Sequence, residues 1–101
     1  MDELELIRDI LYHHIGKSNK VTSSQIAEQI GVQEDATHAK TRALILEAAK
    51  KYRLPLAANN RGYFLINTKA EYIEYIENLN SRIAGIEERK KIITDNYKEK
   101  K

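Results

Sequence analysis

The side chains best suited to bind a polyanion are concentrated in the middle of the sequence. Residues 37–69 contain seven lysines and arginines against one glutamate, a net charge of +6. Residues 1–36 contain three basic and seven acidic residues, a net −4, and residues 70–101 contain seven of each. Because Lys and Arg release counterions when they neutralise phosphates, this local basic segment favours nucleic acid as a partner. A solvated basic helix face is the alternative interpretation of the same charges.

The residue types that catalysis or metal binding requires do not form a recognisable set. The chain has no cysteine, which excludes disulfides, thiolate zinc sites and cysteine nucleophiles. His13 and His14 are adjacent, so they point about 100° apart on a helix, and His38 has no ligand spacing to them. Neither a nucleophile–base–acid set nor a glycine-rich phosphate loop occurs in the sequence. We therefore predict no enzyme activity, no metal site and no cofactor.

Two amphipathic helices are expected before the basic segment. Apolar residues over 4–15 recur at helical spacing, and Gly16 ends this first helix. Residues 22–25, Thr-Ser-Ser-Gln, fit a capping box that begins a second helix over about 23–30. Gly31 then stands where a left-handed residue closes a helix.

The basic segment itself begins with a third predicted helix. It is expected to begin near residues 33–35 and to end near Tyr52, before the break that Pro55 imposes. One stripe is expected to face the core, made of Ala36, Ala39, Ala43, Leu46 and Ala49, with Ile45 and Tyr52 alongside. The opposite face carries Thr37, Lys40, Thr41, Glu47 and Lys51.

A β-hairpin is expected directly after the third helix. Residues 54–58 and 63–66 are short extended runs, and Asn59-Asn60-Arg61-Gly62 between them is rich in residues that tolerate positive φ. Val21 is predicted to pair with this hairpin as a short third strand.

The last element is a long helix with an apolar seam. Thr68-Lys69-Ala70-Glu71 is a second capping box, and the helix that follows is expected to run for about 30 residues, or roughly 45 Å. Lys90 is the one charged position of the seam, and it can set register. The apolar seam positions advance by alternating steps of four and three: Tyr72, Ile76, Leu79, Ile83, Ile86, Ile93 and Tyr97.

The seam predicts that the chain pairs with itself. An exposed apolar stripe needs a partner, and symmetric dimers are the commonest soluble assemblies. The pattern leaves parallel and antiparallel pairing open. In the alternative interpretation, the long helix folds back over the rest of the chain and covers its own seam.

Two segments carry a resemblance to a known group. The tight Ile30-Gly31-Val32 turn between the second and third helices is typical of helix-turn-helix units. Ser24–Val32 resembles the corresponding stretch of small phage and bacterial winged helix-turn-helix DNA-binding proteins. Leu54-Pro55-Leu56 with Arg61-Gly62-Tyr63-Phe64-Leu65 is similar to their hairpin, and the long helix is similar in style to their C-terminal dimerisation helix. The likeness covers residues 4–66, although Gly31 to Pro55 is longer than the usual pattern.

The resemblance implies that the third helix enters the major groove of DNA and that the hairpin forms the wing. Arg42 is the best candidate for reading guanine, because its guanidinium can donate two hydrogen bonds. The acidic start of the helix, Glu34 and Asp35, departs from the group and weakens the expectation of base reading there. The candidates for DNA contact are Ser24, Gln33, Thr37, His38, Lys40, Thr41, Arg42, Asn60 and Arg61.

The sequence thus predicts a mainly helical winged-helix body over residues 1–67 and a dimerisation helix over residues 68–101. The expected function is binding of double-stranded DNA as a homodimer, in transcription regulation, replication or packaging. The alternative is a protein-interaction module that binds a host or partner protein without contacting DNA. No apolar run exceeds four residues and no secretory signal pattern precedes the first helix, so we expect a cytoplasmic protein.

Overall fold

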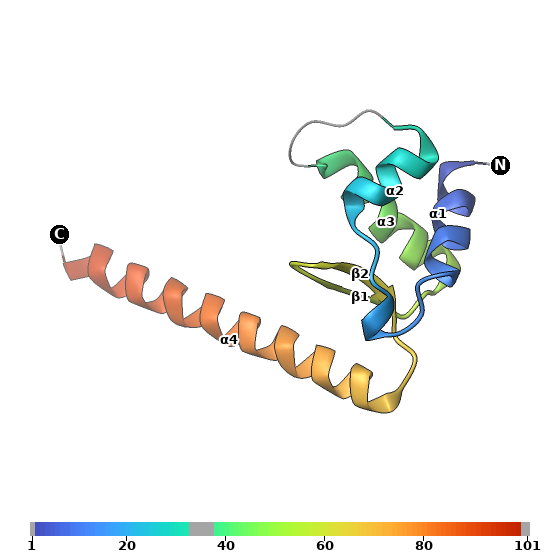
Figure 1. The fold of residues 1–101 in the computed structure, drawn as a ribbon. Helices are drawn as coiled ribbons and strands as arrows, with labels where there is room; N and C mark the ends of the chain where they lie inside the picture. The colour runs from blue at the N-terminus through green and yellow to red at the C-terminus, as the bar shows by residue number, and fades with distance from the viewer. Residues whose placement is uncertain (1, 33–37, 100–101) are drawn as a thin grey trace. The chain divides into compact units, whose positions relative to one another are not determined.

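The computed structural model describes residues 2–32 and 38–99 (Figure 1). The elements in chain order are α1 (Glu3–Tyr12), a short 3-10 helix η1 (Lys17–Asn19), α2 (Ser23–Ile30), α3 (Ala39–Tyr52), β1 (Leu56–Asn59), β2 (Gly62–Leu65) and α4 (Lys69–Glu99). This order confirms the predicted fold class, which is mainly helical with three helices, a hairpin and a long C-terminal helix. The chain divides into two compact units, one ending at Glu71 and the other beginning at Tyr72.

The core of the first unit is formed by one side of each of its helices and by the hairpin. Ile7 and Leu11 lie one helical turn apart on α1 and are fully buried, as are Ile26 of α2 and Ile45 of α3. Burial of each such side chain stabilises the fold by about 1.5–3 kcal/mol. The other members of the cluster are Val21, Ala48, Leu54 and Leu65, so the core reaches from α1 to the hairpin.

Helix α1 ends earlier than the sequence predicts. The last helical residue is Tyr12, whereas the prediction extended the helix to Ile15. The backbone after it pairs with β2 instead: the Gly16 N–H donates to the Leu65 carbonyl at 2.8 Å, and the Leu65 N–H donates to the His14 carbonyl at 2.9 Å. Pairing with the hairpin satisfies the hydrogen bonds of these backbone groups, so extending the helix would add no further backbone hydrogen bonds.

Helix α2 is bounded as predicted. The Thr22 hydroxyl accepts from the Gln25 N–H at 3.0 Å, and the Gln25 amide oxygen accepts from the Thr22 N–H at 2.9 Å. Gly31 follows the helix with φ of 74°, in the left-handed region. The Val32 N–H then donates to the Ala27 carbonyl at 3.0 Å, which closes the C-terminus.

Helix α3 differs from the prediction in its start and in the face that it buries. His38 has φ of 53°, and the helix begins at Ala39, so a helix continuing through position 38 is excluded. The expected start at residues 33–35, like Ala36 of the expected stripe, lies outside the described residues.

The buried positions of α3 are Thr41, Ile45 and Ala48, whereas Ala39 and Ala43 are exposed. The predicted alanine stripe is therefore wrong, and Leu46, also assigned to it, is 54% exposed. Turning Ile45 inward removes more apolar surface from water than turning the alanines inward, and this sets the rotation of the helix.

The hairpin forms with the predicted turn and the predicted third partner. Leu56 pairs with Leu65 and Asn59 with Gly62, which leaves Asn60 and Arg61 as the two turn residues. Val21 forms an antiparallel bridge with Tyr63, with backbone hydrogen bonds of 2.8 and 2.7 Å.

Gly62 is required for this close approach. Its φ is +138°, and a Cβ atom at this position would stand 2.6 Å from the carbonyl oxygen of Val21. Any larger residue would push the hairpin away from the strand-like segment that leads into α2.

The first turn of α4 is tied to the rest of the first unit by one carboxylate. The Glu71 side chain accepts from the Lys17 N–H at 3.0 Å and from the Asn67 N–H at 2.8 Å, while the Glu71 N–H donates to the Thr68 hydroxyl at 3.1 Å. The predicted Thr68 cap is thus present. Donation by the Lys17 and Asn67 N–H groups holds the pKa of Glu71 below its ordinary value.

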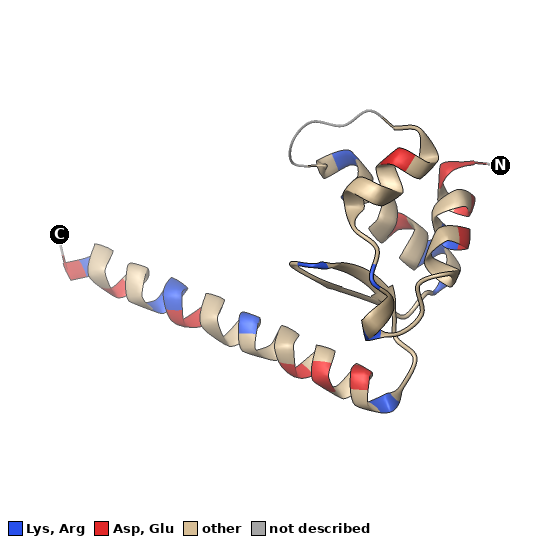
Figure 2. Cartoon of the chain, in the orientation of Figure 1, with Lys and Arg blue, Asp and Glu red and all other residues tan. Residues whose placement is uncertain are grey.

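The second unit is the remainder of α4, from Tyr72 onward, and its apolar residues are exposed. Ile83 is 53% exposed, Ile86 61% and Tyr97 66%. Figure 2 shows both signs of charge distributed along this helix. Within the described residues, no helix combines the length and apolar character that crossing a bilayer requires.

Candidate nucleic-acid interface

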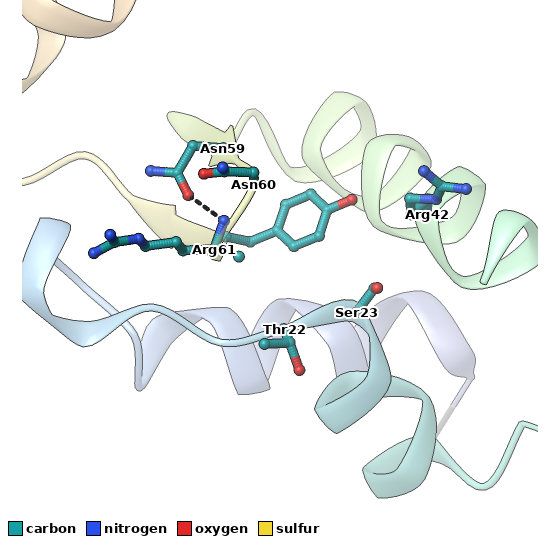
Figure 3. Close-up of a pocket in the computed structure, with 8 residues that line it drawn as sticks. Thr22, Ser23, Arg42, Asn59, Asn60 and Arg61 are labelled. Carbon is teal, nitrogen blue, oxygen red and sulfur yellow. Dashed lines mark hydrogen bonds between the residues drawn. The ribbon is translucent and has the colours of Figure 1, made fainter. Parts of the chain in front are cut away.

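A hollow of about 250 Å³ lies between the hairpin and the starts of α2 and α3 (Figure 3). Three separate parts of the first unit contribute to it, and most of the side chains are polar. The lining residues are Thr22, Ser23, Arg42, Asn59, Asn60, Arg61, Gly62 and Tyr63.

The first turn of α3 positions Arg42. The Arg42 N–H donates to the His38 carbonyl at 3.0 Å, which is the first helical hydrogen bond after the left-handed residue. Arg42 is exposed, because the neighbouring Thr41 occupies the buried side of the same turn. The rotation of α3 therefore aims Arg42 outward.

The turn of the hairpin positions Arg61. The Arg61 N–H donates to the Asn59 Oδ1 at 2.8 Å, which is the side-chain-to-backbone bond that asparagine commonly makes in turns. Arg61 is exposed, and Figure 3 shows it and Arg42 at opposite ends of the hollow, with Thr22 and Ser23 along one side.

The N-terminus of α2 contributes backbone donors. The capping box uses the N–H groups of Thr22 and Gln25. The N–H groups of Ser23 and Ser24 have no acceptor within the helix, since the first turn of any α-helix lacks one. The positive end of the helix dipole adds to their attraction for an anion.

The electrostatic character of the hollow is positive. Arg42 and Arg61 are among its lining residues, and none of the eight described residues around it is acidic. Guanidinium groups, hydroxyls, amides and helix N–H groups are the donors that proteins use to bind phosphate oxygens. The arrangement can therefore hold an anion with many acceptor atoms.

Three of the predicted contact residues meet at this hollow, namely Arg42, Asn60 and Arg61. Ser24 and Lys40 are exposed but do not line it. Gln33 and Thr37 lie outside the described residues.

Thr41 was wrongly predicted to contact DNA. Its exposure is 0%, so it belongs to the core of the first unit and not to its surface. The error follows from the misplaced stripe, because a rotation that buries Ile45 also buries the residue one turn before it.

His38 is half-buried and adopts a left-handed conformation beside the start of α3. Its Nδ1 is buried and has no hydrogen-bond partner among the described residues. It lies outside the residues that line the hollow.

Sequence reasoning assigned four of the lining residues to structure alone. Thr22 caps α2, and Asn59 and Gly62 shape the turn. Because these local roles explain the residue types by themselves, the sequence gives no sign that the three residues also line the hollow. Tyr63 was predicted as part of the extended run over residues 63–66, and its place at the hollow depends on the pairing of β2 with Val21. Ser23 was considered only as part of the helix start.

Neither metal binding nor comparison with known proteins adds to this site. Among the described residues, no group of three or more His, Asp or Glu side chains is placed to hold a metal ion.

No family model matches the chain, and neither a curated protein nor a solved structure matches it. Its function is therefore inferred from its own residues.

Proposed function

We propose that this protein binds double-stranded DNA through α3, the hairpin turn and the start of α2. The observation that supports this function is the convergence of Arg42 and Arg61, from two separate elements, on one hollow that also includes Ser23 at the start of α2. The two guanidinium groups lie at opposite ends of that hollow (Figure 3). Such a spread of positive charge suits an extended chain of phosphates better than a single small anion.

In this proposal each element has a distinct part. Helix α3 lies in the major groove, where Lys40 and Arg42 reach base edges or phosphates. The hairpin acts as a wing whose Arg61 contacts the backbone or the minor groove. The Ser23 and Ser24 N–H groups hold a phosphate at the start of α2 and fix the protein on the duplex.

The same proposal includes a homodimer formed through α4. The exposed apolar residues of that helix support pairing, since burial of such a stripe is favourable. A two-fold dimer presents two copies of α3 to a duplex. Once one copy is bound, the second binds at a high effective concentration, so the dimer binds more tightly than a single copy.

Replacing both arginines tests the DNA-binding proposal. The Arg42→Ala/Arg61→Ala variant should bind a mixed-sequence duplex about tenfold or more weakly at 50 mM salt, because two phosphate contacts are lost from each copy. The slope of log K against log salt should fall by about two for each bound copy, and so by about four for the dimer. Fluorescence anisotropy of a labelled duplex across a salt series measures both quantities.

The matched control is Arg89→Ala/Lys98→Ala, which removes the same charge from α4. This control should keep the slope and nearly all of the affinity of the parent. Equal binding by the parent and by the Arg42→Ala/Arg61→Ala variant contradicts the proposal.

A second candidate function is docking of another protein on α3. The outward side of this helix carries Ala39, Ala43 and Leu46 at helical spacing, and the 54% exposure of Leu46 favours an apolar partner. Under this alternative the parent chain binds no duplex even at low salt, where electrostatic binding to DNA is strongest.

A further inference from the structure

The charged residues beside the α4 seam carry information on how two copies pair. In heptad terms, Ile76, Ile83 and Lys90 occupy a positions, and Leu79 and Ile86 occupy d positions. Arg82 then falls at a g position and Glu87 at the following e position, one on each side of the apolar stripe. The ion pair between Lys91 and Asp95, at 3.3 Å, uses the b and f positions on the outer face.

A parallel, in-register pair brings opposite charges together. In that arrangement each g residue faces the e residue five positions further along the other helix. Arg82 of one copy therefore faces Glu87 of the second copy, and the two-fold axis repeats the contact. Both side chains belong to exposed residues of α4 and are long enough to lie across the seam.

An antiparallel pair satisfies the apolar seam equally well but brings like charges together. Ile76 can pack on Ile93 of the other copy, and Ile83 on Ile86, so apolar burial does not select the orientation. In antiparallel coiled coils, however, g residues face g residues. Arg82 would then face Arg89 of the second copy, twice in each dimer, and this repulsion disfavours the arrangement.

The charged seam position favours two strands. Ile76, Leu79 and Ile83, with isoleucine at a and leucine at d, fit a parallel dimer, whereas Ile86 and Ile93 at d also fit three strands, so the apolar residues alone do not set the number. Lys90 at an a position can extend its ammonium group to solvent from a two-stranded coil, whereas a three-stranded coil encloses it. Two lysines face each other in the parallel dimer, and this costs stability but fixes the register.

We infer that α4 binds a second copy of this chain as a parallel, in-register two-stranded coiled coil from Tyr72 to Tyr97. Reciprocal Arg82–Glu87 contacts between the copies select this orientation. The inference rests on the dimer of the proposed function and is independent of DNA binding. It places both copies of the first unit at the same end of the coiled coil.

Charge reversal at these two positions distinguishes the orientations. Arg82→Glu should raise the Kd of the dimer about three- to tenfold in a parallel coil, because two attractive contacts become repulsive. Glu87→Arg should do the same, and the Arg82→Glu/Glu87→Arg variant should restore the parent Kd. Sedimentation equilibrium of the full chain measures the Kd, and circular dichroism confirms that each variant is helical.

An antiparallel coil predicts the opposite change in the Kd of the Arg82→Glu dimer. There Arg82→Glu places a glutamate against Arg89, so that the single variant should dimerise more tightly than the parent. A tighter single variant, or a double variant as weak as the single ones, overturns the parallel assignment. A trimer in the parent overturns the two-stranded assignment, and a monomeric parent overturns the dimer itself.

A single introduced cysteine gives an independent check, because the chain has none of its own. In the parallel coil, Tyr97→Cys places the two thiols at facing a positions, and mild oxidation should give a disulfide-linked dimer. The antiparallel coil places this thiol opposite Tyr72, so Tyr97→Cys should not cross-link within the dimer. Both readouts are obtained without DNA, so a failure of DNA binding leaves them unchanged.

Discussion

At the scale of single residues, Gly62 constrains the candidate interface most tightly. It closes the hairpin turn that carries Arg61, and its backbone lies against the Val21 carbonyl that precedes α2. Two of the three parts of the hollow therefore meet at one position where a side chain cannot fit. The requirement is steric and conformational at once, since its φ of +138° is itself unfavourable for other residues.

Gly62→Ala should therefore destabilise the first unit by at least about 2 kcal/mol. The added methyl group would stand 2.6 Å from backbone, which cannot move aside as a side chain can. Urea unfolding followed by circular dichroism at fixed protein concentration measures the change. Gly85→Ala is the matched control, because nothing lies within 4 Å of that position, and it should stabilise α4 by about 1 kcal/mol.

At the scale of elements, the start of α4 depends on a carboxylate as well as on its Thr68 cap. Glu71 accepts hydrogen bonds from two N–H groups that are far apart in the sequence, that of Lys17 at the start of η1 and that of Asn67 before α4. Only the ionised carboxylate has two oxygens that both act purely as hydrogen-bond acceptors, because protonation turns one of them into an O–H donor. The anchoring of this helix end is thus coupled to pH.

The stability of the first unit should fall at acid pH in a way that depends on Glu71. Since its pKa in the folded state is lowered from the ordinary value of 4.5, its contribution is fully present above that value. The contribution is lost as the pH falls through the folded pKa. In Glu71→Gln the contribution is absent throughout, so the difference in unfolding free energy between parent and variant should shrink from pH 7 to pH 3.

Thermal unfolding of both proteins across this range measures that difference. Asp2 provides the comparison, because donation by the Glu5 N–H lowers its pKa as well, so the difference between parent and Asp2→Asn should also shrink as the pH falls. A parent–Gln difference that stays constant with pH contradicts the role of the Glu71 carboxylate.

At the scale of the whole molecule, the proposed activity combines two units with different tasks. The first unit carries the cationic hollow, and α4 carries the apolar seam through which we propose that two copies pair. Under this proposal a dimer binds DNA with two interfaces in place of one, so the apparent affinity depends on protein concentration through the dimer equilibrium. Loss of pairing should weaken DNA binding without altering either interface.

Leu79→Asp/Ile83→Asp should convert the dimer to a monomer, because it places four charges in the seam of each dimer. Light scattering at micromolar concentration should show the halved mass. The helices and hairpin of the first unit should remain folded, since neither residue belongs to the core cluster. Asn78→Asp/Ala84→Asp, at outer positions of the same helix, adds the same charge and should leave the dimer intact.

The presence and order of the elements, and the bounds of α2, could be predicted from the sequence because local interactions set them. The Thr22 capping box, Gly31, the Asn-rich turn and the long seam each act over a few residues, and the structure confirms the helix, hairpin and cap that they indicated. Arg42 and Arg61 could be singled out by charge and by their places in the pattern.

Long-range packing decided what the local pattern left open. The rotation of α3, which buries Thr41 and exposes Leu46, follows from the fit of Ile45 into a core built by distant segments. The early end of α1 follows from competition by β2 for its backbone groups. The convergence of Arg42, Arg61 and Ser23 on one hollow likewise arises only when the hairpin pairs with Val21, because no local interaction can bring residues so far apart in the sequence together.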